Sequence, residues 1–314
     1  MARYVLRRLV YLIVQVFWVA TVAFVLIHLV PGNPVRAMLG QDAPAAQVAQ
    51  VEHVLGLDRP ILVQYVSWLG HVARGNFGQS VLGGWQVLPE VMSRLGNTLE
   101  LIVGAIILSI LIGIPLGAAA ARRPNTWTDM ILGWVAMAGI SLPNFVIGTV
   151  LLLLFAVEWH VLPHLEFVAW TKNPLQHLEL LVLPCVTLAA ASGAVVMRMT
   201  RSSLLEVTRA DFMRTARAKG LSEAAAVRRH ALKNALNPVV SILGLQVGAL
   251  LGGTVIVETI YGWPGLSTLL LDAISNRDYP VIQGIVLAIA FLTVVVNLGV
   301  DLVYAYLDPR IRYV

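Results

Sequence analysis

The sequence predicts an all-α, polytopic membrane protein with six transmembrane helices and with both chain ends in the cytoplasm. Of the 314 residues, 58% are hydrophobic and only 12% are charged, whereas about a quarter of the residues of soluble domains are charged. Six apolar runs are about 20 residues long or longer, the length that a helix needs to cross the hydrocarbon core. The Lys and Arg residues also gather on one side of these runs. Lipid must therefore be the main solvent of the chain.

The six runs are predicted to be continuous helices, because a helix satisfies its own backbone hydrogen bonds in lipid. Gly113 and Pro115 lie inside the second run and are expected to be tolerated there as a close contact and a kink. The first run follows three arginines, and no small-residue cleavage site precedes Pro31, so we expect a retained span rather than a signal peptide. The runs cover residues 9–30, 98–121, 130–157, 178–197, 239–257 and 281–304.

The orientation follows from the positive charges, because cytoplasmic loops retain Lys and Arg. Counted on alternate sides of the six runs, 16 of the 22 Lys and Arg residues fall on the side that holds both chain ends. Nine of these 16 lie between Arg198 and Lys233. The net charge of +5 would suggest a nucleic-acid partner in a soluble protein, but its placement beside the spans indicates membrane orientation instead. No nucleic acid is expected as a partner.

Three connections are long enough to form structure of their own. Residues 31–97 are predicted to form a small folded element outside the cell, between a first unit at 1–30 and a five-helix core at 98–314. Residues 200–237 on the inner face are predicted to form two short helices separated by Lys219-Gly220-Leu221-Ser222, with Gly220 in a left-handed turn and Ser222 as a helix cap. Residues 258–280 contain a turn at Gly262-Trp263-Pro264-Gly265 and an apolar stretch too short to span, which we expect to be a short helix near the membrane surface.

The basic inner connection is the most informative part of the sequence. It is much longer than two spans need for their connection, and its arginines would suit either anionic lipid head groups or a protein partner. Small residues at Ala216 and Ala218 beside Gly220 are expected to let another protein approach closely. Length and spacing therefore favour a docking element.

The same stretch resembles the inner-face coupling segment of binding-protein-dependent ABC permeases, in the form typical of dipeptide and oligopeptide importers. The motifs that carry the resemblance extend over nearly the whole chain, and the long connection after the first span is similar to that of the B-type permease of each pair. They are TARAKGLSE at 215–223, HALKNALNP at 230–238, LVPGNP at 29–34, LGLDRP at 55–60, QYVSWL at 64–69, ETIYGWPGLSTLLLDAI at 258–274, RDYPVIQG at 277–284 and NLGVDLVYAYLDPRIR at 297–312.

The resemblance implies the type I permease fold of ABC importers and a place in the bacterial inner membrane. It also implies four kinds of partner: a second homologous permease, two cytoplasmic ATPase subunits or one with two domains, an external substrate-binding protein, and a peptide substrate. Residues 200–238, called the coupling segment below, would contact the ATPase. Its candidate contact residues are Arg214, Thr215, Ala216, Arg217, Ala218, Lys219, Gly220, Leu221, Ser222, His230, Asn234 and Pro238.

This chain departs from the broad permease signature at two places. Arg214, Thr215 and Ala216 stand where many relatives have Glu-Ala-Ala, and Lys233 stands where a proline is common. Both departures resemble the peptide branch more than the sugar or amino-acid branches. They narrow the expected substrate and leave the coupling role unchanged.

The end of the fifth run and the turn after it provide candidates for the outer mouth of a translocation path, namely Glu258, Tyr261, Trp263, Pro264 and Gly265. Other polar residues are weaker candidates. His160 and His164 are separated by Pro163, which breaks a shared helical face, so no metal site is expected there. Asp301 lies near the inner end of the last run, where snorkelling or capping is expected.

The chain has no energy source of its own. It contains no G-x-x-x-x-G-K-[ST] loop, and none of its three lysines follows a glycine, so ATP and magnesium are expected on partner subunits and no cofactor on this chain. A self-contained secondary transporter would place ionisable residues near the membrane midplane, where this chain has almost none. An intramembrane protease would need a nucleophile or metal motif that is absent. Within the importer interpretation, the sequence leaves open whether the solute is a peptide, glutathione or a nickel chelate.

Overall fold

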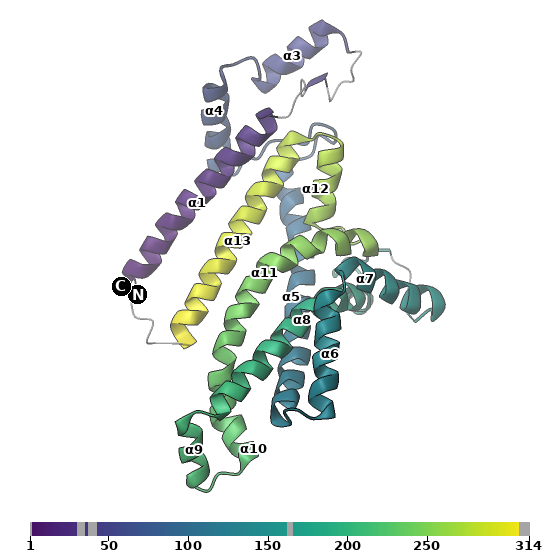
Figure 1. Ribbon diagram of the computed structural model, residues 1–314. Helices are drawn as coiled ribbons and strands as arrows, with labels where there is room; N and C mark the ends of the chain where they lie inside the picture. Colours follow the sequence, from purple (N-terminus) through teal and green to yellow (C-terminus); the bar gives the residue numbers. More distant parts are fainter. Residues whose placement is uncertain (1, 30–34, 37–42, 162–165, 308–314) are drawn as a thin grey trace. The chain divides into compact units, whose positions relative to one another are not determined.

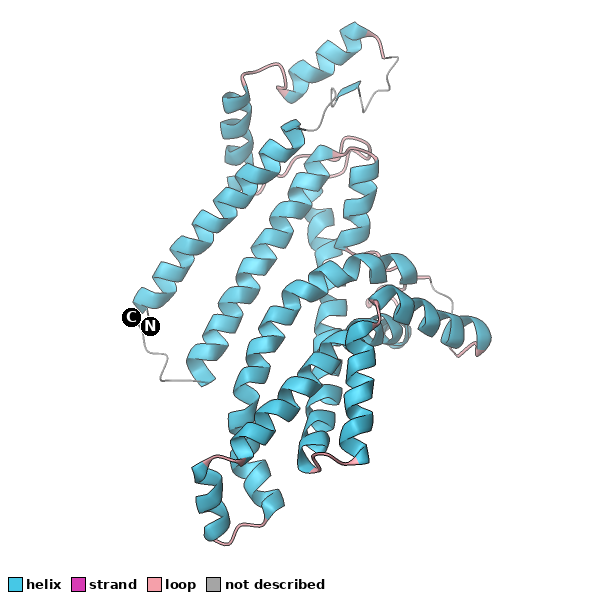
Figure 2. Cartoon of the chain, in the orientation of Figure 1, coloured by secondary structure: helices cyan, strands magenta, loops and turns pink. Residues whose placement is uncertain are grey.

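The computed structural model describes residues 2–29, 35–36, 43–161 and 166–307, and this part of the chain is almost entirely helical (Figures 1 and 2). Extended pairing among the described residues consists of one isolated bridge between Gln79 and Gln86. The chain divides into two compact units. One contains the residues up to Asn97 together with Pro264–Val295, and the other contains Thr98–Trp263 with the residues from Val296 onward.

The first unit contains the element predicted at 31–97 and the short helix predicted after the fifth run. Its helices are α1 (Ala2–Leu29), α3 (Ala45–Leu55), α4 (Ile61–Ala73), the start of α5 (Val87–Arg122), α12 (Leu266–Ser275) and most of α13 (Tyr279–Leu307). An aromatic cluster of Phe24, Tyr65 and Trp68 packs α4 against α1. Ser80 Oγ donates to the buried carboxylate of Asp278 at 2.5 Å, which ties the turn before α5 to the turn before α13.

The second unit holds the remainder of α5 and the helices that carry the coupling segment. These are α6 (Trp127–Ser141), α7 (Asn144–Leu152), a π-helical turn (Leu153–Glu158), α8 (Pro174–Thr208), α9 (Asp211–Ala218), α10 (Glu223–Ala226), a second π-helical turn (Val227–Ala231) and α11 (Leu232–Tyr261). Helix α8 contacts α6, α7 and α11 and is central to this unit. The two short inner helices are confirmed as α9 and α10, but α10 continues through the π-helical turn directly into α11.

The third apolar run, predicted at 130–157, does not form one continuous helix. The helices on either side of Leu142 and Pro143 meet at a bend of 101°. Proline has no N–H to donate and its ring forces the preceding residue out of the helical region, and Leu142 accordingly has φ −79° and ψ 127°. Pro115 lies within α5 without ending it, as predicted. A proline therefore broke one apolar run and was tolerated in another.

The number of spans stays a prediction. In the described part of the chain four helices are long and apolar enough to cross a membrane, or five if the bent pair counts as one span. Helix α1 is the predicted first span, but the side chains of its first residues lie outside the described part. The long helices exceed their predicted bounds. Helix α5 has 36 residues, or about 54 Å at 1.5 Å per residue, whereas the hydrocarbon core is about 30 Å thick.

Small residues bring α5 and α8 close together. A Cβ atom placed on Gly113 would lie 2.7 Å from the carbonyl oxygen of Gly193, so the two backbones are nearly in contact. One turn earlier on α5, the hydroxyls of Ser109 and Ser192 lie 2.6 Å apart. Close backbone approach through glycine and serine is the usual way in which membrane helices pack. We call this contact the α5–α8 seam.

Candidate functional site

The coupling segment is attached to the second unit by the apolar side of α9. Met213 and Ala216 are buried there, and they form one cluster with Leu204 of α8, Ala226 of α10 and Ala231 of the following π-helical turn. Buried positions 213 and 216 are three residues apart, so they lie on the same face of a helix. The cluster therefore joins α9 to the end of one long helix and to the beginning of the next (Figure 1).

The opposite side of α9 is basic and exposed. Arg214 and Asp211 form an ion pair of 3.5 Å in which the two side chains are 76% and 96% exposed, so this pair contributes little to stability. Arg217 Nη2 donates to the carbonyl oxygen of Thr208 at 3.3 Å. Thr215, Ala218 and Lys219 are also exposed. These side chains are available to a partner surface.

Gly220 ends α9 in the left-handed turn that the sequence predicted. Its φ is +84°. The Gly220 N–H donates to the carbonyl of Arg217 at 2.9 Å, and the Leu221 N–H donates to that of Ala216 at 3.4 Å. This hydrogen-bond pair is the Schellman motif, which requires a positive φ and so favours glycine. A Cβ atom on Gly220 would have no atom of this chain within 4 Å.

Two of the predicted contact residues face inward. The side chain of Ala216 is only 8% exposed and packs within the α9 cluster, so its role in the approach of a partner stays a prediction. Leu221 packs against the same cluster, as the Schellman motif favours for the residue after the glycine. Ser222 is exposed, and its carbonyl accepts from the Ala226 N–H at 2.9 Å. The exposed part of this stretch therefore consists of Ala218, Gly220 and the basic side chains around them.

The second half of the coupling segment is helical but departs from regular α-helix geometry. His230 lies in the π-helical turn, and Asn234 Nδ2 donates to its carbonyl at 3.0 Å. Pro238 lies inside α11 and has no N–H to donate back along the helix. π-Helical turns and prolines are both places where a helix departs from regular geometry. The three predicted residues lie along 230–238, between the short inner helices and the fifth span.

At the C-terminal end of α11, the predicted mouth residues Glu258, Tyr261 and Trp263 are buried. Thr98 Oγ1 donates to the carboxylate of Glu258 at 2.7 Å, and Glu258 is fully buried. The Tyr261 hydroxyl donates to the carbonyl of Gly148 at 3.1 Å and lies 2.9 Å from Thr187 Oγ1. These bonds attach the end of α11 to α5, α7 and α8.

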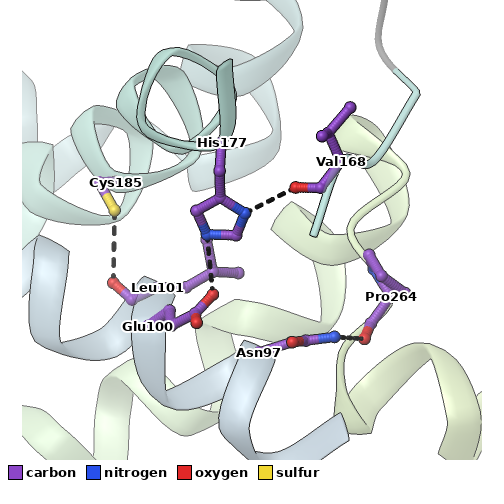
Figure 3. Close-up of polar contacts among 7 residues, drawn as sticks. All are labelled: Asn97, Glu100, Leu101, Val168, His177, Cys185 and Pro264. Atoms are coloured by element: carbon purple, nitrogen blue, oxygen red, sulfur yellow. Dashed lines mark hydrogen bonds and ion pairs between the residues drawn. The ribbon is translucent and has the colours of Figure 1, made fainter. Parts of the chain in front are cut away.

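The turn after α11 is confirmed at Gly262, which has φ +61°. Trp263 is buried, and its backbone N–H donates to the backbone carbonyl of Glu258 at 2.9 Å. Pro264 and Gly265 belong to the first unit, where the Pro264 carbonyl accepts from Asn97 Nδ2 at 2.8 Å (Figure 3) and Gly265 precedes α12. The five predicted mouth residues are therefore divided between the two units.

A buried histidine near the start of α8 was not among the predicted site residues. His177 is 1% exposed. Its Nδ1 lies 2.8 Å from the carbonyl oxygen of Val168 and its Nε2 lies 3.1 Å from the Glu100 carboxylate (Figure 3). The rings of Trp170 and Trp263 lie edge-on or tilted to the imidazole. Nothing in the local sequence connects these residues, because they come from separate elements.

An ion pair between a buried carboxylate and a guanidinium whose side chain is 34% exposed was also not predicted. Asp129 in the first turn of α6 is 7% exposed and accepts from Arg201 of α8. Arg201 Nε donates to Oδ1 at 2.5 Å and Nη2 donates to Oδ2 at 2.7 Å. The Asn125 N–H adds a third hydrogen bond to Oδ2 at 3.0 Å. Two carboxylate oxygens facing the fork of one guanidinium is the strong, directional form of an Arg–Asp pair.

Family comparison identifies the machinery to which this arrangement belongs. Residues 113–313 match the family model described as "Binding-protein-dependent transport system inner membrane component", and residues 1–102 match the model of the N-terminal part of such membrane components. The chain belongs to this family of ABC importer permeases. The match with the core model covers more than half of the chain, and the coupling segment lies wholly within it.

Curated relatives match the permease over its full length. It is 43% identical over 313 residues to the glutathione transport system permease protein GsiC of Salmonella choleraesuis, with 100% of both chains covered. The identity to the GsiC protein of Escherichia coli strain K12 is 40% with the same coverage. Among solved structures, the inward-facing MetNI methionine ABC transporter matches with a TM-score of 0.55 at 17% identity, covering 71% of the permease and 98% of that chain. That likeness supports the fold alone.

Family membership decides several predictions made from the sequence. The permease is a multi-pass inner-membrane subunit of an ABC importer, as predicted, and it is not the ATPase. An ATPase subunit and a substrate-binding protein are its partners. A self-contained secondary transporter and an intramembrane protease are both excluded by the same match.

The structure gives no support for a metal site at His160. Among the described residues, no three His, Cys, Asp or Glu side chains gather in a way that would hold a metal ion. His160 has φ +50°, and its Nδ1 lies 3.2 Å from the carbonyl oxygen of Glu158. His164 lies outside the described residues, as does the side chain of Asp301.

Proposed function

We propose that the permease imports short peptides of about the size of glutathione. The observation that carries this proposal is the identity of 40–43% with glutathione permeases along the whole chain. Glutathione is itself a tripeptide, so this substrate is compatible with the peptide-type motifs in the sequence. The substrate-binding protein would make the first selection, and the permease would provide the path.

A second permease of similar architecture would complete that path. Helix α11 has an exposed face at Leu245, Gly248, Gly252 and Ile256, with a spacing of three or four residues that places them on one side of the helix. A Cβ atom on Gly248 or Gly252 would have no atom of this chain within 4 Å. Glycines four residues apart on an apolar helix suit close packing against another membrane helix. Purification of the intact transporter should yield one copy of this chain beside one copy of a second permease, and a transporter that works with this chain as its sole permease would contradict that.

The coupling segment would seat in a cleft of one ATPase subunit. Its basic side, around Arg214, Arg217 and Lys219, would meet carboxylates on that surface, and opposite charges would guide the orientation more than the affinity. The proposed contact can be measured directly. The Ala218→Cys variant, modified with a photoactivatable maleimide, should cross-link to the ATPase subunit in the assembled transporter. Absence of this cross-link would contradict the docking role.

The substrate proposal is tested first on the substrate-binding protein and then on the whole transporter. Calorimetry on the substrate-binding protein should show binding of glutathione or of another short peptide, and proteoliposomes with the whole transporter should take up the same solute when ATP is supplied. Binding of a nickel chelate without any peptide would overturn the substrate proposal. It would leave the family assignment unchanged.

A further inference from the structure

We propose that Asp129 is a positioning residue for ATP-driven import. By holding the start of α6 to Arg201 of α8, it would make α6 follow the movement of the coupling segment. This inference rests on the docking role proposed above for that segment. It concerns the step after docking, namely how movement of the coupling segment reaches the membrane-spanning helices.

The first step runs within the coupling segment, from α9 to Arg201 near its start. Helix α8 continues without a break to Thr208, and Arg201 is seven residues before that end, or about 10 Å at 1.5 Å per residue. Helix α9 begins at Asp211 and shares a buried cluster with Leu204 of α8. A displacement of α9 by a partner is therefore transferred to the part of α8 that carries Arg201.

The second step runs from Arg201 to α6. Asp129 accepts three hydrogen bonds, of which two come from Arg201 and one comes from the Asn125 N–H. Because the carboxylate is buried and the guanidinium is held at both oxygens, rotation or sliding of α6 against α8 would leave a buried charge without its partner. The pair thus fixes the register of two helices at the inner face.

The third step carries the movement along α6. The two helices are antiparallel, because Asp129 pairs with Arg201 while Gly139, farther along α6, meets the earlier residue Ala190 at the α8 backbone. A Cβ atom on Gly139 would lie 2.8 Å from the Ala190 carbonyl oxygen. Next to this contact, Ala136 of α6 packs with Ala194 and Met197 of α8. The ion pair adds a charged, directional contact to this apolar packing, and it therefore fixes the register at the start of α6.

The fourth step passes through the bend at Pro143. Helix α7 follows immediately, and its Gly148 carbonyl accepts from the Tyr261 hydroxyl at 3.1 Å. The methyl group of Thr187 would lie 3.2 Å from a Cβ atom on Gly148, so α7 packs tightly at this end. A tilt of α6 would therefore change the contacts around Tyr261, one of the predicted mouth residues.

The experiment measures uptake per ATP hydrolysed in proteoliposomes that contain the whole transporter. The Asp129→Asn variant keeps the shape of the side chain but loses its charge. We expect its uptake per ATP to fall by about 2- to 30-fold, the range found for residues that modulate coupling between distant sites. The double variant Asp129→Arg with Arg201→Asp should recover part of the ratio that each single variant loses.

A matched control removes a different ion pair. Glu90 and Arg94 pair at 2.6 Å within one helix and are about one-third exposed, so Glu90→Gln should leave uptake per ATP unchanged. A normal ratio in Asp129→Asn would overturn the proposal. So would failure of the double variant to recover any of the ratio at equal amounts of inserted protein, because the pairing would then not be the cause.

The cross-link of Ala218→Cys separates this proposal from the docking role. If the cross-link forms in both wild-type and Asp129→Asn backgrounds and the ratio falls only in the variant, both proposals are supported. If it forms in both and the ratio stays normal, docking holds and the role of Asp129 is refuted. If it never forms, the docking role fails by itself, and with it the basis for this inference.

Discussion

Replacing Gly220 separates the effect of backbone strain from the effect of a partner surface. Its φ of +84° favours glycine, and a side chain with a Cβ atom costs about 1–2 kcal/mol in this left-handed region. Asparagine is tolerated there better than other residues. Because no atom of this chain lies within 4 Å of the added Cβ, steric hindrance within the permease is not expected from the first carbon of any side chain at this position.

Gly75 is a matched control within the same chain. It follows α4 with φ +76°, and a Cβ atom there also has no atom within 4 Å. Its hydrogen bonds are those of the same motif, since the Gly75 N–H donates to Val72 and the Asn76 N–H donates to His71. The Gly→Asn and Gly→Ala variants should therefore lower the free energy of unfolding by similar amounts at positions 75 and 220.

The two positions should differ in transport. Forcing an extra group into a packed contact costs about 1–3 kcal/mol, which corresponds to about 5- to 150-fold in an equilibrium. We expect Gly220→Asn to reduce substrate-stimulated ATP hydrolysis and uptake within that range, and Gly220→Glu to reduce them further. Gly75→Asn should leave ATP hydrolysis normal. Equal activity of both Asn variants in proteoliposomes, at matched protein amounts, would refute the idea that a partner surface lies against Gly220.

Three further predictions test packing and topology. Gly113→Ala should lower the melting temperature of the solubilised transporter, because overpacking costs about 1–3 kcal/mol, whereas Gly96→Ala should not, because a Cβ atom there is unobstructed. Tyr261→Phe should cost about 1–3 kcal/mol in the free energy of unfolding, since it leaves buried hydrogen-bond partners unsatisfied, and a wild-type melting curve would contradict this. A cysteine at Ala45 should react with an impermeant maleimide from outside and one at Ser222 only after permeabilisation, with the buried native cysteine as a low background. The reverse labelling pattern would refute the predicted orientation.

The parts of the fold that depend on local sequence were predicted well. Apolar length placed most of the long helices, because crossing the hydrocarbon requires about 20 apolar residues. Gly220 and Gly262 were recognised as turn positions because a positive φ is a local requirement. The polar connection between the fourth and fifth apolar runs also has a local turn signal, and it predicted α9 and α10. It did not show that α10 continues into α11.

The contacts that depend on packing between distant elements were not predictable in this way. Asp129 and Arg201 are 72 positions apart in the sequence, and neither has a local signal beyond being charged near the end of an apolar run. His177 and Glu100 are 77 positions apart and belong to different helices. The bend at Pro143 differs from these two contacts, because the sequence itself shows that a proline lies inside the apolar run. Its effect depends on whether neighbouring groups satisfy the freed backbone, and that also is a property of packing.

Helix α8 takes part in both of these unpredicted contacts. It carries His177 near one end and Arg201 near the other, and its 35 residues span about 52 Å at 1.5 Å per residue. Along the α5–α8 seam its neighbour approaches through Gly113, which faces the Gly193 carbonyl and the Val196 side chain, and through the hydroxyl of Ser109. The ion pair of Asp129 lies between α8 and a different helix, α6, and its two directional hydrogen bonds hold these two helices in one register where the coupling segment begins.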